Sequence, residues 1–175
     1  MSEESSATFI VTGASFGIGR AVTKALSARR FKVVAVARSE ERLESLATEC
    51  AGQVQALVAD LATKVGVERV VASVAAEAEI AGIVHSAGSV ISLQPYSELD
   101  SDELVEHLRI HVAAPIGLYQ ALAKTHSIKR MLFIDSYSAT THRVGWSAYS
   151  IVKAAAQMAA RSAAEELPET DTMRV

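Results

Sequence analysis

Thr8-Phe9-Ile10-Val11-Thr12-Gly13-Ala14-Ser15-Phe16-Gly17-Ile18-Gly19-Arg20 is the stretch that decides the fold of this 175-residue chain. An apolar run typical of a β-strand passes through a turn with the glycine spacing G-x-x-x-G-x-G, and a helical pattern follows. Such a turn lets backbone N–H groups and a helix N-terminus hold a phosphate, because glycine permits close approach and adopts φ angles that other residues avoid. The spacing differs from the G-x-G-x-x-G of the general dinucleotide fingerprint. We interpret the stretch as a nucleotide-binding turn, with a plain strand-to-helix loop as the alternative.

Composition narrows the class of protein. Half of the residues are hydrophobic and the formal net charge is −3, with no run of Lys or Arg that would follow a nucleic-acid backbone. The apolar runs are shorter than the ~18 residues that a membrane-spanning helix needs. Cys50 is the only cysteine, which excludes an internal disulfide and a thiolate metal cluster. We expect a cytoplasmic protein that binds neither nucleic acid nor membrane, with a flexible tail over residues 1–7.

Apolar runs alternate with helical patterns along the rest of the chain. Strands are predicted over residues 31–37, 53–58, 79–84 and 129–134, and helices lie between them, the longest over 97–124 with a kink at Pro115. This alternation predicts one parallel, doubly wound α/β sheet of the Rossmann type, with the first strand central and helices on both faces. Ser39 is the expected N-cap of a helix that ends at Glu49.

Ligands of such a sheet bind beyond the carboxyl ends of its strands. After the second strand, Arg38 stands where an NAD-binding fold places an acidic residue on the ribose 2′-hydroxyl, and a guanidinium there suits a 2′-phosphate. NADP is therefore favoured over NAD, with a plain surface arginine beside Glu40 and Glu41 as the alternative. After the third strand, Asp60 is expected to contact an adenine, to cap the next helix, or both. The small residues at 86–88 indicate close backbone approach to a ligand.

Tyr149 and Lys153 form a candidate acid/base pair, since residues four apart share one face of a helix. An ammonium near a phenol stabilises the phenolate, which suits the phenol to proton transfer with a carbonyl or an alcohol. Ser136 follows the fifth strand, where its hydroxyl could bind a substrate oxygen or form a turn. A solvated helix face also produces the Y-x-x-x-K spacing by chance, so this pair gains its weight from the other motifs.

In this order, the motifs resemble those of the classical short-chain dehydrogenase/reductase family from Thr8 onward. Residues 12–19 match its cofactor motif T-G-x-x-x-G-x-G, Tyr149 and Lys153 match its Y-x-x-x-K, and Ser136 matches its catalytic serine. The resemblance implies a single NADP-binding domain over residues 8–175. It also implies hydride transfer between NADP(H) and a small carbonyl or alcohol substrate.

Roles for individual residues follow from the same resemblance. Tyr149 would be the general acid/base, Ser136 would hold the substrate oxygen, and Lys153 would lower the pKa of the tyrosine and bind the nicotinamide ribose. The implied cofactor-binding residues are Gly13, Ser15, Phe16, Gly17, Ile18, Gly19, Arg38, Asp60, Leu61, Ser86, Ala87, Gly88, Tyr149 and Lys153.

Two positions depart from the family pattern. The family's N-N-A-G reads His85-Ser86-Ala87-Gly88 here, which removes the amides that brace the central strand end. The asparagine that completes the catalytic tetrad is replaced by His111, whose imidazole could relay a proton or disrupt the relay. His107 and His111 have the i, i+4 spacing of a metal pair, but no third ligand is nearby in the sequence, so no metal is expected.

The last residues, 173–175, resemble the opening of a sixth strand, whereas members of the family continue further. The chain is therefore expected to be C-terminally truncated relative to the family, with the fifth strand as an exposed edge. An alternative function is a non-catalytic NADP-binding or interaction module. The alanine-rich helix after Lys153 and the helix around residues 104–122 imply, with the resemblance, a homodimer or homotetramer.

Overall fold

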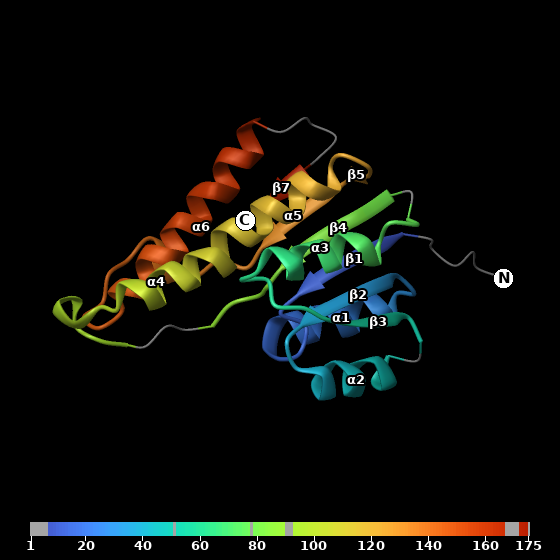
Figure 1. The fold of residues 1–175 in the computed structure, drawn as a ribbon, viewed down its shortest axis with the longest axis horizontal. Coiled ribbons are helices and arrows are strands. Elements are labelled where there is room, and N and C mark those ends of the chain that lie inside the picture. Colours follow the sequence, from blue (N-terminus) through green and yellow to red (C-terminus); the bar gives the residue numbers. More distant parts are fainter. Residues whose placement is uncertain (1–6, 51, 78, 90–92, 167–171, 175) are drawn as a thin grey trace.

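The computed structural model describes residues 7–50, 52–77, 79–89, 93–166 and 172–174, the last of these by their backbone (Figure 1). A seven-stranded parallel sheet has the order β3-β2-β1-β4-β6-β7, and β5 pairs with the start of β4. The first strand is central, as predicted. The strands are β1 (Thr8–Thr12), β2 (Lys32–Ala37), β3 (Val54–Val58), β4 (Glu79–His85), β5 (Ser127–Ile128), β6 (Arg130–Phe133) and β7 (Thr172–Arg174).

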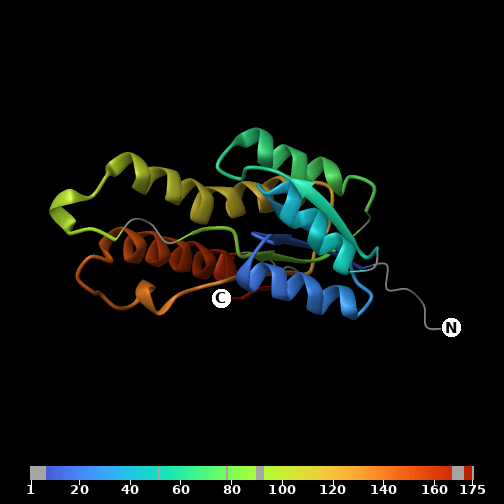
Figure 2. The ribbon, with the colours of Figure 1, turned by 90° about the horizontal axis from the view of Figure 1, so that it is seen from below.

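Helices cover both faces of this sheet. They are α1 (Gly17–Ala28), α2 (Glu40–Glu49), α3 (Lys64–Ser73), α4 (Ser101–Leu108), α5 (Ala114–Leu122) and α6 (Ser147–Glu166), with a π-helical segment η2 (Arg109–Ala113) and short 3-10 helices η1 (Tyr96–Glu98) and η3 (Tyr137–Ala139). α6 packs against α4 and η2, and these helices extend together beyond the sheet (Figure 2). None of the helices in the described ranges has the length and apolar character needed to span a bilayer.

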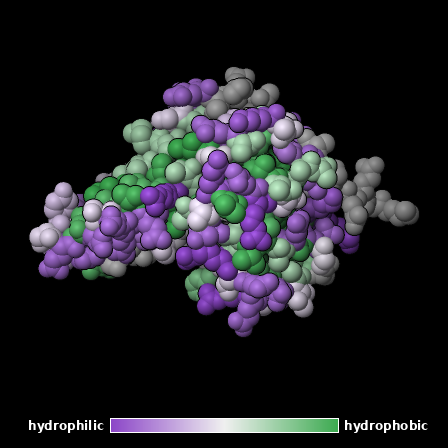
Figure 3. Space-filling view, in the orientation of Figure 1, coloured by the Kyte–Doolittle hydropathy of each residue, from purple (hydrophilic) through white to green (hydrophobic). Residues whose placement is uncertain are grey.

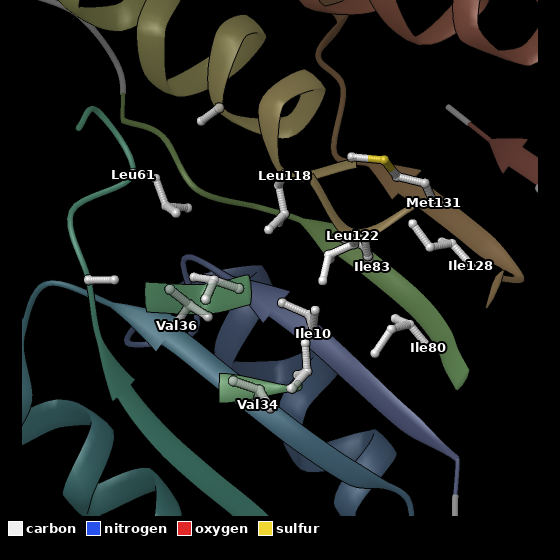
Figure 4. Close-up of a cluster of buried hydrophobic side chains, with 14 of the residues drawn as sticks. Ile10, Val34, Val36, Leu61, Ile80, Ile83, Leu118, Leu122, Ile128 and Met131 are labelled. Atoms are coloured by element: carbon white, nitrogen blue, oxygen red, sulfur yellow. The ribbon is translucent and has the colours of Figure 1, made fainter. Parts of the chain in front are cut away.

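Two hydrophobic clusters hold the layers together, because successive side chains of a strand point to opposite faces of the sheet. Ile10, Val34 and Ile83 belong to the cluster that packs under α3 and α5, where Leu118 and Leu122 lie over the strands (Figure 4). The neighbouring strand residues pack on the other face against α1 and α2; they include Val11, Val33, Ala35 and Val84. The predicted doubly wound architecture is therefore confirmed.

The long helix begins later than predicted. It starts at Ser101 because Asp100 caps it: the Asp100 Oδ1 atom accepts hydrogen bonds from the N–H groups of Asp102 (2.8 Å) and Glu103 (3.2 Å). The irregularity expected at Pro115 takes the form of the π-helical segment η2 directly before it. Proline disturbs a helix there because it has no N–H to donate.

Three smaller expectations can be compared with the structure. Ser39 is the N-cap residue of α2, which ends at Glu49, as predicted, although its side chain makes no capping hydrogen bond. Of the roles left open for Asp60, capping is wrong: Thr63 caps α3, since the Thr63 hydroxyl accepts from the Gly66 N–H at 3.0 Å. β6 is not an edge strand, because β7 pairs with it in parallel.

Candidate cofactor and active site

The glycine turn between β1 and α1 lies in close contact with the backbone at the ends of β2 and β4. Gly13 has a φ of +68°, and a Cβ there would lie only 2.6 Å from the carbonyl oxygen of Ser86. A Cβ at Gly19 would collide with the backbone carbonyl of Gly13. The turn is tied to β2 by the hydrogen bond from the Ala14 N–H to the Val36 carbonyl (3.1 Å). These contacts explain why the turn needs glycine and why the α1 N-terminus faces the strand ends.

A cavity of about 440 Å³ lies at the carboxyl ends of the strands, where the topology predicts a ligand site. Of the predicted site residues, Gly19 does not line it and instead packs behind the turn. The predicted residues that line the cavity are Gly13, Ser15, Phe16, Gly17, Ile18, Arg38, Asp60, Leu61, Ser86, Ala87, Gly88, His111, Ser136, Tyr149 and Lys153. The fold thus gathers residues from 13 to 153 around one space.

One end of the cavity carries an uncompensated positive charge. Arg38 is exposed and makes no salt bridge or side-chain hydrogen bond within the described residues, and neither Glu40 nor Glu41 pairs with it. The guanidinium of Arg42 lies over the ring of Phe16, 5.9 Å from its centroid. This end therefore combines an aromatic ring with two cations, a combination that attracts anions.

The other end holds the candidate catalytic side chains. Tyr149 is half-buried, with Trp146 packed edge-on at 5.9 Å between the ring centroids. Lys153 is buried, and its ammonium donates to the Ile134 carbonyl at 2.5 Å. Burial lowers the pKa of Lys153, and the carboxylate of Asp135 acts in the opposite direction. The Ser136 hydroxyl accepts from the Ser138 N–H (3.2 Å), so it also forms the turn that was its alternative role.

His111 lies deep in the cavity wall on the π-helical segment η2. Its ring fills the space beside Gly88, where a Cβ of residue 88 would collide with it. The ring also stacks on that of His107, with 6.0 Å between the ring centroids. Burial lowers the pKa of His111 to about 4, and the nearby charge of Lys153 acts in the same direction. The imidazole is therefore neutral at pH 7, and its buried Nε2 atom has no hydrogen-bond partner in the described part of the chain.

Sequence reasoning gave no role to two further residues of the site, His85, which it placed at a strand end, and Asp135. His85 is buried at the end of β4, where it contacts Thr12 of β1 and the Ile110 carbonyl of η2. Asp135 lines the cavity; its Oδ2 atom accepts from the Gln157 side chain, and its buried Oδ1 atom has no partner among the described residues. A histidine and an acid directly after apolar strands are the signals that could have drawn attention to them. The ranges that the structure describes contain no cluster of three or more His, Cys, Asp or Glu suited to a metal.

The parallel sheet, the glycine turn and the cavity at the strand ends define an α/β protein of the Rossmann type. Comparison with known proteins identifies the family: the model of the short chain dehydrogenases matches residues 7–175. The chain therefore belongs to the short chain dehydrogenase family, as the motifs suggested.

Individual relatives agree with this assignment. L-xylulose reductase of Cavia porcellus is 35% identical over 115 residues, which are 66% of this chain and 45% of that protein. A short-chain dehydrogenase from Streptomyces avermitilis has the same fold, with a TM-score of 0.89 and 29% identity over 99% of this chain and 64% of that one. A short chain dehydrogenase of Shigella flexneri, solved in complex with NADP, gives a TM-score of 0.84 and 26% identity over 97% and 74% of the two chains. The chain spans about half the length of the curated relatives that it matches.

Proposed function

We propose that this chain is an NADP(H)-dependent oxidoreductase that acts on a carbonyl or alcohol group of a small molecule. The observation that carries the proposal is the single cavity lined by the glycine turn, by Arg38, and by Ser136, Tyr149 and Lys153. The NADP complex of the Shigella flexneri relative supports the choice of cofactor. The residues present fit such a group, because the cradle at Gly13 admits no side chain and Arg38 has no partner in the described residues.

The chain's residues have separate tasks in this proposal. The N–H groups at the start of α1 bind the pyrophosphate, and Arg38 binds the 2′-phosphate. When bound, NADP(H) supplies or accepts the hydride. The Tyr149 hydroxyl gives a proton to the carbonyl oxygen in reduction and takes one back in oxidation, while the Ser136 hydroxyl orients that oxygen. The Lys153 ammonium stabilises the tyrosine anion and binds the nicotinamide ribose.

His111 has a place in the same proposal. His111 lines the cavity, and its buried Nε2 atom has no hydrogen-bond partner in the described residues, so this atom would bind a substrate hydroxyl that enters the cavity, which suits a proton relay.

A non-catalytic NADP-binding module is the second candidate. One observation favours it: the Lys153 ammonium is directed to the Ile134 carbonyl, and the Tyr149 hydroxyl has no hydrogen bond to Lys153 or Ser136 in the described residues. Such a module would bind NADPH without ever oxidising it. Oxidation of bound NADPH by a simple diketone or quinone would exclude this candidate.

Titration with NADPH and NADH, followed by nicotinamide fluorescence, tests the proposed cofactor. We expect tighter binding of NADPH, and Arg38→Ala should weaken it roughly tenfold or more while leaving NADH unchanged, because a charge-assisted hydrogen bond is worth ~1.5–3 kcal/mol. Arg29→Ala is the matched control, since Arg29 is an exposed arginine at the far end of α1. Failure of the wild-type chain to bind either dinucleotide would overturn the proposal.

We also propose that the protein forms a homodimer or homotetramer through α4, α5 and α6. Large apolar side chains are exposed on these helices, namely Val105, Ile116, Ile151 and Met158. Figure 3 shows hydrophobic surface along this part of the molecule. Sedimentation velocity should show an oligomer that Met158→Glu shifts toward the monomer, because burying an unpaired carboxylate is costly. Val65→Glu, at an exposed site on α3, should leave the mass unchanged, and a monomeric wild type would contradict the proposal. The cytoplasmic location expected from the sequence stays a prediction.

A further inference from the structure

One backbone carbonyl of the π-helical segment η2 has no donor within its own helix. The Ala114 N–H donates to the Arg109 carbonyl, five residues back, in the π pattern. In an α-helix that N–H would serve the Ile110 carbonyl instead. The next donor in the π pattern would be residue 115, which is a proline and has no N–H. The Ile110 carbonyl is therefore left without a helical partner.

His85 supplies the missing donor. Its Nε2 atom lies 3.1 Å from the Ile110 carbonyl oxygen, and because a carbonyl can only accept, Nε2 must carry the proton. In the neutral ring Nδ1 is then an acceptor, and it takes a hydrogen bond from the Thr12 hydroxyl at 3.0 Å. The same hydroxyl oxygen accepts from the N–H groups of Ser86 and Ala87, each at 3.2 Å. Every donor and acceptor in this chain of contacts is consistent in direction.

We propose that His85 is a positioning residue that holds the π-helical segment η2 and thereby directs His111 into the cavity. The π segment contains one residue more than regular helical turns would, and each residue rotates the helix by about 100°. The hydrogen bond from His85 offsets the loss of the helical hydrogen bond to the Ile110 carbonyl. Without that donor, the π form is no longer stabilised, and the return of the segment to α-helix would turn His111 away from Gly88. The buried network of His85 and Thr12 thus sets the orientation of His111 through the backbone of η2.

The environment of His111 makes this orientation measurable. The titratable groups around its ring are Lys153, His107 and His85, of which His85 is itself kept neutral by burial. The Ser89 backbone also contacts the ring, and Gly88 leaves the space that the ring fills. A ring in this position is shielded from water, whereas a ring turned outward is not. The catalytic consequence of the positioning rests on the proposed oxidoreductase function, but the position itself is tested without turnover.

Histidine NMR titration between pH 5 and pH 8 tests the inference. We expect no titration of His111 in the wild type within this range, and none in His85→Gln, because the glutamine amide can replace Nε2–H as donor to Ile110. His85→Asn can still meet Thr12 but is too short for Ile110, so His111 should now titrate toward its ordinary pKa of ~6.5. His126→Leu is the matched control: it removes another buried histidine that bonds a backbone carbonyl, that of Val74 at 3.0 Å, and it should leave His111 unchanged.

The outcomes separate cleanly. Equal behaviour of the Gln and Asn variants would overturn the inference, as would a wild-type His111 that titrates near ~6.5. If the variants do not fold, ¹⁵N shifts of the wild-type protein still decide it: the Nε2–H tautomer of His85 is required, and the Nδ1–H tautomer would contradict it. If the wild-type protein does not oxidise NADPH, that result counts against the proposed function but not against the positioning role of His85, because the histidine measurements involve neither cofactor nor substrate.

Discussion

Tyr149→Phe is expected to reduce turnover by ~10²–10⁴-fold, the usual contribution of a general acid/base, while NADPH binds almost as well as before. The substitution removes only the hydroxyl that moves the proton and keeps the ring that packs against Trp146. Stopped-flow measurement of NADPH oxidation, combined with fluorescence titration of the cofactor, separates the two effects.

Tyr137→Phe is the matched control for this result. Tyr137 is exposed on η3 beside Ser136, but it does not line the cavity. Its variant should turn over at the wild-type rate. A Tyr149→Phe protein that retains full activity would show that another group transfers the proton, and the assignment of Tyr149 would have to be given up.

Gly13→Ala is expected to weaken NADPH binding by roughly 100-fold or more. An alanine at this position must adopt a positive φ, which costs ~1–2 kcal/mol, and its Cβ would press on the backbone of Ser86 and Ala87 at 2.6–2.8 Å, which adds overpacking of ~1–3 kcal/mol. The turn must therefore move away from β4 and out of the shape that receives a pyrophosphate. Isothermal titration calorimetry measures the loss of NADPH affinity, and thermal unfolding measures the loss of stability from the strained turn.

Gly117→Ala provides the comparison, because Gly117 lies within α5, has no atom near its absent Cβ, and shows no positive φ. Alanine is the better helix former, so this variant should be as stable as the wild type or slightly more stable. Undiminished NADPH binding by Gly13→Ala would mean that the glycine turn does not hold the cofactor.

The sheet and the rim of the cavity could be predicted because their signals are local. Each main strand is a run of adjacent apolar residues, and the topology of alternating strands and helices then places Gly13, Arg38 and Ser136 at one edge. The two-residue strand β5 was missed because Ser127–Ile128 is too short to show a period of two. Asp100 was overlooked as a helix cap because the predicted helix already began at residue 97, in the segment that the structure shows as the 3-10 helix η1.

The role of His85 could not be predicted, since it depends on partners distant in the sequence. Thr12 lies 73 residues before it and Ile110 lies 25 residues after it, and only the packed fold brings them together. The π-helical segment was hidden for the same reason: Pro115 announces an irregularity, but the donor that stabilises its form lies on another element. The protonation of His111 follows from burial, which a sequence does not display.

The central place of β1 has a consequence for how the molecule is assembled. β1 pairs on one side with β2, about two dozen residues later, and on the other with β4, where Thr12 stands opposite His85. Pairings this distant form slowly, because a long loop must close before any contact stabilises it. The glycine turn meets Ser86 only when β4 has joined the sheet. During synthesis, the glycine turn therefore reaches its contacts with Ser86 only at the late step at which β4 completes the middle of the sheet.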